Sequence, residues 1–126
     1  MSSSACPCGN GAYADCCEPL HDGVRAARTA EELMRSRYSA FAIGLSDYIF
    51  RTWHPRTRPQ DVSIEGLTWS DLRILSTVEG GEDDDEGVVE FSASYAIGPL
   101  KGDVHEHSGF LRHAGRWHYV APVSES

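Results

Sequence analysis

Apolar residues that recur at intervals of three and four predict one long amphipathic helix in the first half of the chain. They are Ala30, Leu33, Met34, Tyr38, Phe41, Ala42 and Leu45. This spacing places them on one face of a helix. Thr29, with Glu32 three residues later, forms a capping box at its start. Gly44 is expected to interrupt it.

A second, shorter helix is predicted directly afterwards. Ser46 is expected to cap it, and it should continue to Trp53. Pro55 forces the residue before it out of helical geometry. Residues 55–59 are therefore expected to form a loop. Residues 20–27, before the first helix, are too few and too polar to own a core and are expected to be a connection.

From Trp69 onward the hydrophobic period changes to two, which predicts half-buried strands. Four strands are expected, over residues 72–78, 89–97, 104–112 and 116–120. Residues 98–103 should turn the chain, and Ala114-Gly115 is a two-residue hairpin signal. Two helices followed by about four antiparallel strands predict an α+β layer, with the helices covering one face of a curled sheet.

The composition fits one globular domain with a modest core. The chain has 126 residues, 40% of them hydrophobic and 24% charged. No apolar run approaches the roughly 18 residues of a membrane span. Residues 1–5 lack the basic and apolar regions of a secretory signal, so we expect a cytoplasmic protein whose thiols stay reduced.

Charge is distributed unevenly along the chain. The formal net charge is -8, and six acids lie between Glu79 and Glu86, which predicts a solvated hairpin loop. Between Arg25 and Arg58, by contrast, seven arginines accompany three acids. A dedicated nucleic-acid binder is usually basic overall, so nucleic acid is not the expected partner. A protein with an acidic surface is expected instead.

All four cysteines lie within twelve residues: Cys6, Cys8, Cys16 and Cys17. Disulfides within either close pair would form very small, strained rings, and a reducing compartment disfavours bridging one pair to the other. A redox pair at Cys16-Cys17 would need an exposed thiolate of low pKa. Zn²⁺ takes four ligands in a tetrahedron, so four crowded thiols predict one structural zinc with no open position.

The cysteine segment resembles the SEC-C zinc motif, which also ends the SecA preprotein translocase ATPase. The resemblance is carried by Cys-Pro-Cys-Gly at residues 6–9 and Tyr-x-x-Cys-Cys at residues 13–17. Seven residues separate the second and third cysteines, one fewer than in the family. SecA-type motifs end in Cys-His, which makes His21 the competitor of Cys17 for the fourth ligand position. The SecA motif contacts a chaperone and the ribosome, so the resemblance implies a protein-interaction role.

Further landmarks are similar to the YchJ family of uncharacterised bacterial proteins. They are Pro19, His21, Gly23 and residues 29–31, 33–41 and 52–55, with a weaker similarity at residues 115–117. This resemblance implies a cone-shaped nuclear transport factor 2-like fold. It divides the chain into a zinc-binding segment at residues 1–22 and a cone domain at residues 23–126.

Four side chains are candidates for lining a pocket in the cone domain: Arg37, His54, Tyr95 and Glu106. Arg37 projects from the apolar stripe toward the sheet, and a buried guanidinium needs a carboxylate partner. Arg37 is expected to form an ion pair with Glu90 or Glu106, and the alternative is that it binds a small anionic ligand. His54 is interpreted as a packed corner at the helix exit, with pocket lining as its alternative.

Four histidines near the end of the chain are expected to share one face of the sheet: His105, His107, His113 and His118. A two-residue turn at 114–115 and the alternation of the pleat place them there. His-x-His on a strand is a known metal geometry. Histidines also occur on a solvent-exposed face without any functional role, and this second interpretation is favoured.

Three functions follow, in decreasing order of support. The first is a zinc-binding, cytosolic interaction module. The second is a small-molecule binder or enzyme that uses the cone-fold pocket, which rests on fold analogy alone. The third is a thiol redox protein. Spacing nominates no Ser, His and Asp arrangement and no carboxylate pair as catalytic, so a protein without enzymatic activity is favoured.

Overall fold

A computed structural model describes residues 5–9, 11–59 and 68–123, and within these ranges one 3₁₀ helix and three α-helices precede four strands. The helical elements are η1 (Tyr13–Asp15), α1 (Glu18–His21), α2 (Ala30–Ile43) and α3 (Ser46–Arg51), and the strands are β1 (Thr68–Glu79), β2 (Glu86–Ile97), β3 (Leu100–His113) and β4 (Arg116–Pro122). The strands form one antiparallel sheet in the order β1-β2-β3-β4. The predicted α+β class is confirmed. None of the helices in these ranges has the length and apolar character that a membrane crossing requires.

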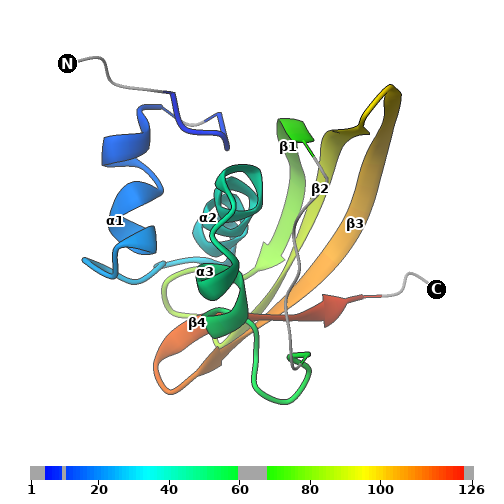
Figure 1. The fold of residues 1–126 in the computed structure, drawn as a ribbon. Coiled ribbons are helices and arrows are strands. Elements are labelled where there is room, and N and C mark those ends of the chain that lie inside the picture. The colour runs from blue at the N-terminus through cyan, green and yellow to red at the C-terminus, as the bar shows by residue number, and fades with distance from the viewer. Residues whose placement is uncertain (1–4, 10, 60–67, 124–126) are drawn as a thin grey trace.

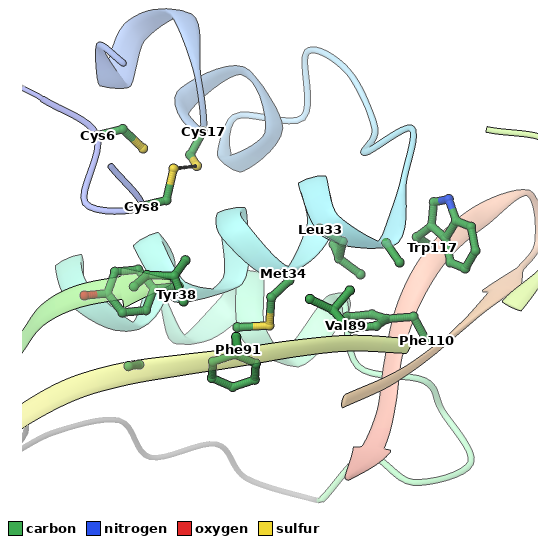
Figure 2. Packing of buried hydrophobic residues seen from close by; sticks show 13 residues of the cluster. Cys6, Cys8, Cys17, Leu33, Met34, Tyr38, Val89, Phe91, Phe110 and Trp117 are labelled. Carbon is green, nitrogen blue, oxygen red and sulfur yellow. Dashed lines mark hydrogen bonds between the residues drawn. The ribbon is translucent and has the colours of Figure 1, made fainter. Parts of the chain in front are cut away.

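Helix α2 is the middle layer of the structure (Figure 1). One side of it packs on the sheet, and the cysteine segment packs on the other side (Figure 2). Leu33 and Met34 of α2 share a buried cluster with Val89 and Phe91 of β2, and Cys17 belongs to the same cluster. The cysteine segment is therefore continuous with the core of the domain.

Local signals account for both ends of α2. Thr29 Oγ1 accepts a hydrogen bond from the Glu32 backbone N–H at 3.1 Å, which is half of the predicted capping box. The Glu32 carboxylate reaches one residue further back than a capping box requires and accepts from the Arg28 N–H at 2.7 Å. At the other end, Gly44 takes the left-handed conformation with φ of 85° and donates to the Ala40 carbonyl.

The helices around α2 differ from the prediction in three respects. Ser46 is the first residue of α3 and gives no side-chain cap; the N-cap position is Leu45. The helix ends at Arg51, and Trp53 lies outside it in a parallel bridge with Tyr119 of β4. Residues 20 and 21, expected to be part of a connection, belong to α1 instead. Leu20 is buried in a second cluster beneath α3.

Strand β3 begins four residues earlier than predicted, so the expected turn at residues 98–103 shrinks to Gly98-Pro99. Residues 100–103 pair with β2 instead, and Gly102 lies opposite Tyr95. A Cβ atom on Gly102 would stand 2.7 Å from the Tyr95 hydroxyl. Glycine therefore continues the strand here, because it leaves room for the Tyr95 ring.

The acidic segment between β1 and β2 is a hairpin loop, as predicted, with Glu82, Asp83 and Asp85 exposed. Its backbone carbonyls have a cationic partner. Arg112 of β3 donates to the carbonyls of Asp84 and Glu82, each at 2.6 Å, while its guanidinium lies 4.6 Å from the ring centroid of Trp117. The loop is therefore anchored to the sheet by its backbone, and the side chains of Glu82, Asp83 and Asp85 remain in solvent.

The two faces of the sheet differ in character. The inner face, toward α2, carries Val89, Phe91, Ala93 and Phe110, all buried. The outer face carries their neighbours along each strand. The register pairs Glu90 with His107, Ser92 with His105 and Leu111 with His118. All four C-terminal histidines lie on this outer face, which confirms the expectation from the pleat.

Candidate metal centre

The four thiols meet in one cluster between the N-terminal segment and α2. Sγ of Cys8 lies 3.5 Å from Sγ of Cys16 and 3.8 Å from Sγ of Cys17, and Cys16 and Cys17 are 3.8 Å apart. All four sulfur atoms, including Cys6, lie within 4.8 Å of one another. A tetrahedral zinc with bonds of about 2.3 Å has sulfurs about 3.8 Å apart. The four thiols therefore match the spacing of a four-sulfur metal site.

A glycine turn brings the first two cysteines back toward the second pair. The Cys6 N–H donates to the Gly11 carbonyl at 2.7 Å, and the Gly9 N–H donates to the Cys6 carbonyl at 2.9 Å. Gly9 and Gly11 have φ of 82° and 111°, a region that other residues rarely adopt. The loop thus closes although it is one residue shorter than in the resembled motif.

Helix α2 forms the floor of the cluster. Cys6, Cys8 and Cys17 are only 3%, 2% and 1% exposed. The Ser39 hydroxyl lies 3.3 Å from Sγ of both Cys6 and Cys17 and donates to Cys17. Arg35, also on α2, donates to the Cys8 carbonyl at 3.1 Å. The same helix that carries the core therefore orients the thiols.

The electrostatics of the thiols disfavour redox chemistry. Burial raises the pKa of Cys16 to about 12, and its hydrogen bond to Cys8 acts in the same direction. The hydrogen bond to Cys8, followed by burial, raises the pKa of Cys17. A reactive cysteine needs a low pKa and an accessible sulfur. A thiolate in this cluster needs a nearby cation, which is what a metal ion supplies.

His21 lies beside the cluster, but both of its ring nitrogens are engaged elsewhere. Nε2 donates to the Ser36 carbonyl of α2 at 2.7 Å, so Nδ1 is free to accept from the Tyr13 hydroxyl, also at 2.7 Å. The ring lies edge-on to Tyr48, with centroids 4.6 Å apart. Burial lowers the pKa of His21. These contacts give His21 a structural role between α1 and α2.

Replacing His21 by alanine is expected to destabilise the fold by about 2 kcal/mol, because the buried Ser36 carbonyl and the half-buried Tyr13 hydroxyl lose their hydrogen bonds. The metal content should stay at one ion per chain, whereas the Cys17→Ala variant should lose it. Urea unfolding and elemental analysis of both variants test this. Loss of the metal in His21→Ala with retention in Cys17→Ala would make His21 the fourth ligand.

Arg37 is buried, at 4% exposure, without the predicted ion pair. Among the described residues its partners are the carbonyl of Ile49 at 3.0 Å, Oγ1 of Thr52 at 2.8 Å, and the rings of Trp53 and Tyr119 at 5.3 and 4.6 Å. The expectation of a salt bridge to Glu90 or Glu106 is wrong. Carbonyl dipoles and aromatic faces replace the carboxylate, and burial lowers the pKa of Arg37 to about 10.

The two carboxylates proposed for Arg37 are held elsewhere. Glu90 lies on the outer face, where it accepts from Ser76 Oγ at 2.9 Å. Glu106 lies on the inner face and accepts from the Tyr119 hydroxyl at 3.3 Å. Tyr119 therefore stands between Glu106 and the Arg37 guanidinium.

The other candidate pocket residues lie at separate places. The ring of His54 is on the outer face, 4.9 Å from that of His113, which fits the packed-corner interpretation. Tyr95 packs against Trp69 at the far end of the sheet, with ring centroids 5.7 Å apart. Arg37 and Glu106 come near each other, and His54 and Tyr95 join neither of them.

The structure brings Arg116 together with two arginines of the group at residues 25–58, an arrangement that the sequence did not predict. A cleft of about 320 Å³ between the loop after α1, α3 and β4 is lined by Arg25, Arg51 and Arg116, together with Tyr48 and His118. Its described lining includes no carboxylate. The spacing along the chain gives no sign of this cleft, because Arg116 enters only through the position of β4.

Comparisons with known proteins agree with this architecture. The family description "YchJ, middle NTF2-like domain" matches residues 29–122. A UPF0225 protein from Chromobacterium violaceum is 46% identical over 126 residues, which cover 96% of this chain and 93% of that protein. Another, from Streptomyces coelicolor, is 47% identical over 122 residues, 95% of each.

Two solved structures are similar over nearly the whole chain. The solution structure of a SEC-C motif containing protein from Rhodopseudomonas palustris has a TM-score of 0.84 and 35% identity, and covers 98% of this chain and 100% of that one. The crystal structure of a SEC-C motif containing protein from Psychrobacter arcticus has a TM-score of 0.77 and 29% identity, and covers 98% of this chain and 84% of that one.

Proposed function

This chain belongs to the YchJ family, and from that membership and the geometry of its thiols we propose that it is a zinc-stabilised protein-interaction module. One structural Zn²⁺ is held by Cys6, Cys8, Cys16 and Cys17. The observation that carries the proposal is the closure of this cluster against α2, with three of its thiols almost fully buried. A zinc with four protein ligands has no open position for substrate, so it stabilises structure and does no chemistry.

The proposed role of the zinc is to make a short segment rigid. In the described part of residues 5–21 the helical elements are η1 and α1, of three and four residues. Such short elements are not stable on their own, and metal binding supplies the missing folding free energy. We also propose that the chain divides between residues 22 and 23, into the zinc-binding segment and the domain at residues 23–126 on which this segment packs. We also propose a cytoplasmic location, where the thiols stay reduced.

The proposed partner has an acidic surface. Some of the seven arginines at residues 25–58 are already paired or buried, so fewer than seven are available to it. Arg25 makes a two-pronged ion pair with Glu32 at 2.8 and 2.9 Å, and Arg35 pairs with Glu31 at 3.0 Å. Arg37 is buried. The exposed members of the group include Arg28, Arg51 and Arg56. These three are the better candidates for contacting a partner. Attraction by such charges acts mainly on association rate and salt sensitivity.

The test is capture of a partner from the native lysate by the zinc-loaded full chain and by two charge variants. The double variant Arg28→Glu, Arg56→Glu should reduce capture, most strongly at low salt, without loss of zinc. The matched control Asp83→Asn, Asp85→Asn changes two exposed charges in the acidic loop and should leave capture unchanged or slightly stronger. Equal capture by all three proteins would contradict the proposed surface.

The cationic cleft supports a second candidate function, the binding of a small anionic ligand. Three arginines line this cleft in a chain whose formal net charge is -8. Arg25 is paired with Glu32, so Arg51 and Arg116 are the two proposed to bind the anion. Planar guanidinium groups suit carboxylate and phosphate. Titration with inorganic phosphate, followed by NMR, should shift the signals of residues around Arg51 and Arg116. Arg116→Ala should abolish the shifts and Arg73→Ala, on β1, should not. An unchanged spectrum would remove this candidate.

A further inference from the structure

A second group of metal-ligating side chains lies on the outer face of the sheet, on the side away from the cysteines. Nε2 of His105 is 2.6 Å from Oε2 of Glu90, and Nε2 of His107 is 3.5 Å from Oε1 of the same carboxylate. One ligand atom from each of the three residues lies within 4.8 Å of the other two. Two imidazoles on one strand thus converge on one carboxylate of the next.

The register of the sheet creates this convergence. Glu90 of β2 lies directly opposite His107, and Ser92 lies opposite His105. Residues two apart on a strand point to the same face, so both imidazoles stand beside Glu90, with their ring centroids 5.6 Å apart. Ser76 of β1 donates to Glu90 Oε1 at 2.9 Å. Three neighbouring strands therefore contribute to the arrangement, and the ligands lie on regular strands.

We propose that Glu90, His105 and His107 form a second metal site, which binds one divalent transition-metal ion of the zinc class. Two histidines and one glutamate form a zinc-binding set that leaves a fourth position for water or another ligand. Imidazole and carboxylate donors suit Zn²⁺ and its neighbours, in contrast to the all-thiol cluster. The ion takes the place of the proton that the imidazole shares with the carboxylate.

The surroundings permit the small movements that binding requires. A tetrahedral ion with bonds of about 2.0 to 2.2 Å has its ligand atoms about 3.4 Å apart. The His105 side chain is 55% exposed, whereas those of His107 and Glu90 are 21% and 23% exposed. His105 is therefore free to adjust, and the remaining coordination position faces solvent. The Ser76 hydrogen bond acts as an outer-shell support for Glu90.

The other histidines of the outer face supply matched controls. His113 and His118 lie near His54, with ring centroids 4.9 to 6.2 Å apart in the three pairs. Among the described residues, only the four cysteines and the group around Glu90 bring three ligand atoms within 4.8 Å. The proposal therefore separates His105 and His107 from His113 and His118, although all four share one face.

Calorimetric titration of the full chain with Zn²⁺, starting from protein that already carries one equivalent, tests the proposal. A second equivalent should bind more weakly than the first. His105→Ala and Glu90→Gln should weaken it by more than the roughly 100-fold upper limit for loss of an outer-shell contact, and Ser76→Ala by about 10-fold. His113→Ala should leave the affinity unchanged. Circular dichroism confirms that each variant is folded.

Cobalt substitution separates the two sites, because thiolate ligands give intense sulfur-to-cobalt charge-transfer absorption and nitrogen and oxygen ligands do not. The first equivalent of Co²⁺ should produce these bands, and the second should add only weak ligand-field absorption that disappears in Glu90→Gln. The absence, in the unmodified chain, of an equivalent that adds only ligand-field absorption would overturn the proposal. Its survival in both His105→Ala and Glu90→Gln would overturn it equally. Neither result depends on what the cysteine cluster does.

Discussion

Chelation of the zinc should disorder residues 5–21 while α2 and the sheet remain folded. Metal binding supplies on the order of 10 kcal/mol to short zinc-binding segments, and η1 and α1 together have too few residues to replace it. The helix and the four strands have their own contacts through Leu33, Val89 and Phe110. Hydrogen exchange measured by NMR should show complete loss of protection in the N-terminal segment and retained protection in β2 and β3.

The remaining domain should nevertheless be less stable without the metal. Cys6, Cys8 and Cys17 cover α2 on the side opposite the sheet, so disorder in this segment exposes part of the same core.

Ser39→Ala is the matched variant for the zinc site: it removes the hydroxyl that contacts Cys6 and Cys17 and should weaken zinc affinity by 10- to 100-fold without abolishing the site. A chelated protein that keeps full protection in residues 5–21 would contradict the proposed role of zinc.

Replacing Arg37 by alanine should lower the free energy of unfolding by about 3 kcal/mol. The substitution removes two hydrogen bonds from a charged group, among them the 3.0 Å bond to the Ile49 carbonyl, and opens a cavity between Trp53 and Tyr119. Arg37→Met should cost less, about 1 to 2 kcal/mol, because it fills most of that volume without burying a charge. Urea denaturation of the two variants measures both values.

Arg58→Ala is the control for this experiment. Its guanidinium also lies over an aromatic ring, 4.2 Å from the centroid of Phe50, but the residue is partly exposed. Its replacement should cost less than about 1 kcal/mol. Zinc content should be unchanged in all three variants. An Arg37→Ala variant as stable as the unmodified chain, but unable to bind a small anion, would instead support a ligand-binding role for this arginine.

Local signals explain which parts of the fold were predictable. The limits of α2 follow from Thr29 and Gly44, whose effects act within one turn of the helix. The sequence does not predict the start of β3, because residues 100–103 include only one apolar side chain and a glycine. Their strand conformation depends on pairing with β2, where Gly102 makes room for the Tyr95 ring. That contact is set by the register of two strands, which no local pattern encodes.

The same distinction applies to the sites. Four cysteines close in sequence are also close in space, so spacing alone predicted the thiol cluster. The partners of Arg37 come from α3 and β4, and its burial against Trp53 and Tyr119 requires the tertiary fold. The place of Glu90 beside His105 and His107 depends on the short turn at Gly98-Pro99, which fixes the register. With the predicted turn at residues 98–103, the register of β2 and β3 is not fixed, so the sequence does not predict that Glu90 lies beside the two histidines.

X-ray absorption at the zinc edge, on protein loaded with one equivalent, tests the central claim most directly. Four sulfur neighbours at about 2.3 Å, with no nitrogen or oxygen in the first shell, are the predicted result. Three sulfurs with one nitrogen would place His21 in the site in place of a cysteine. A purified protein that binds no zinc while all four thiols react freely in the native state would contradict the account.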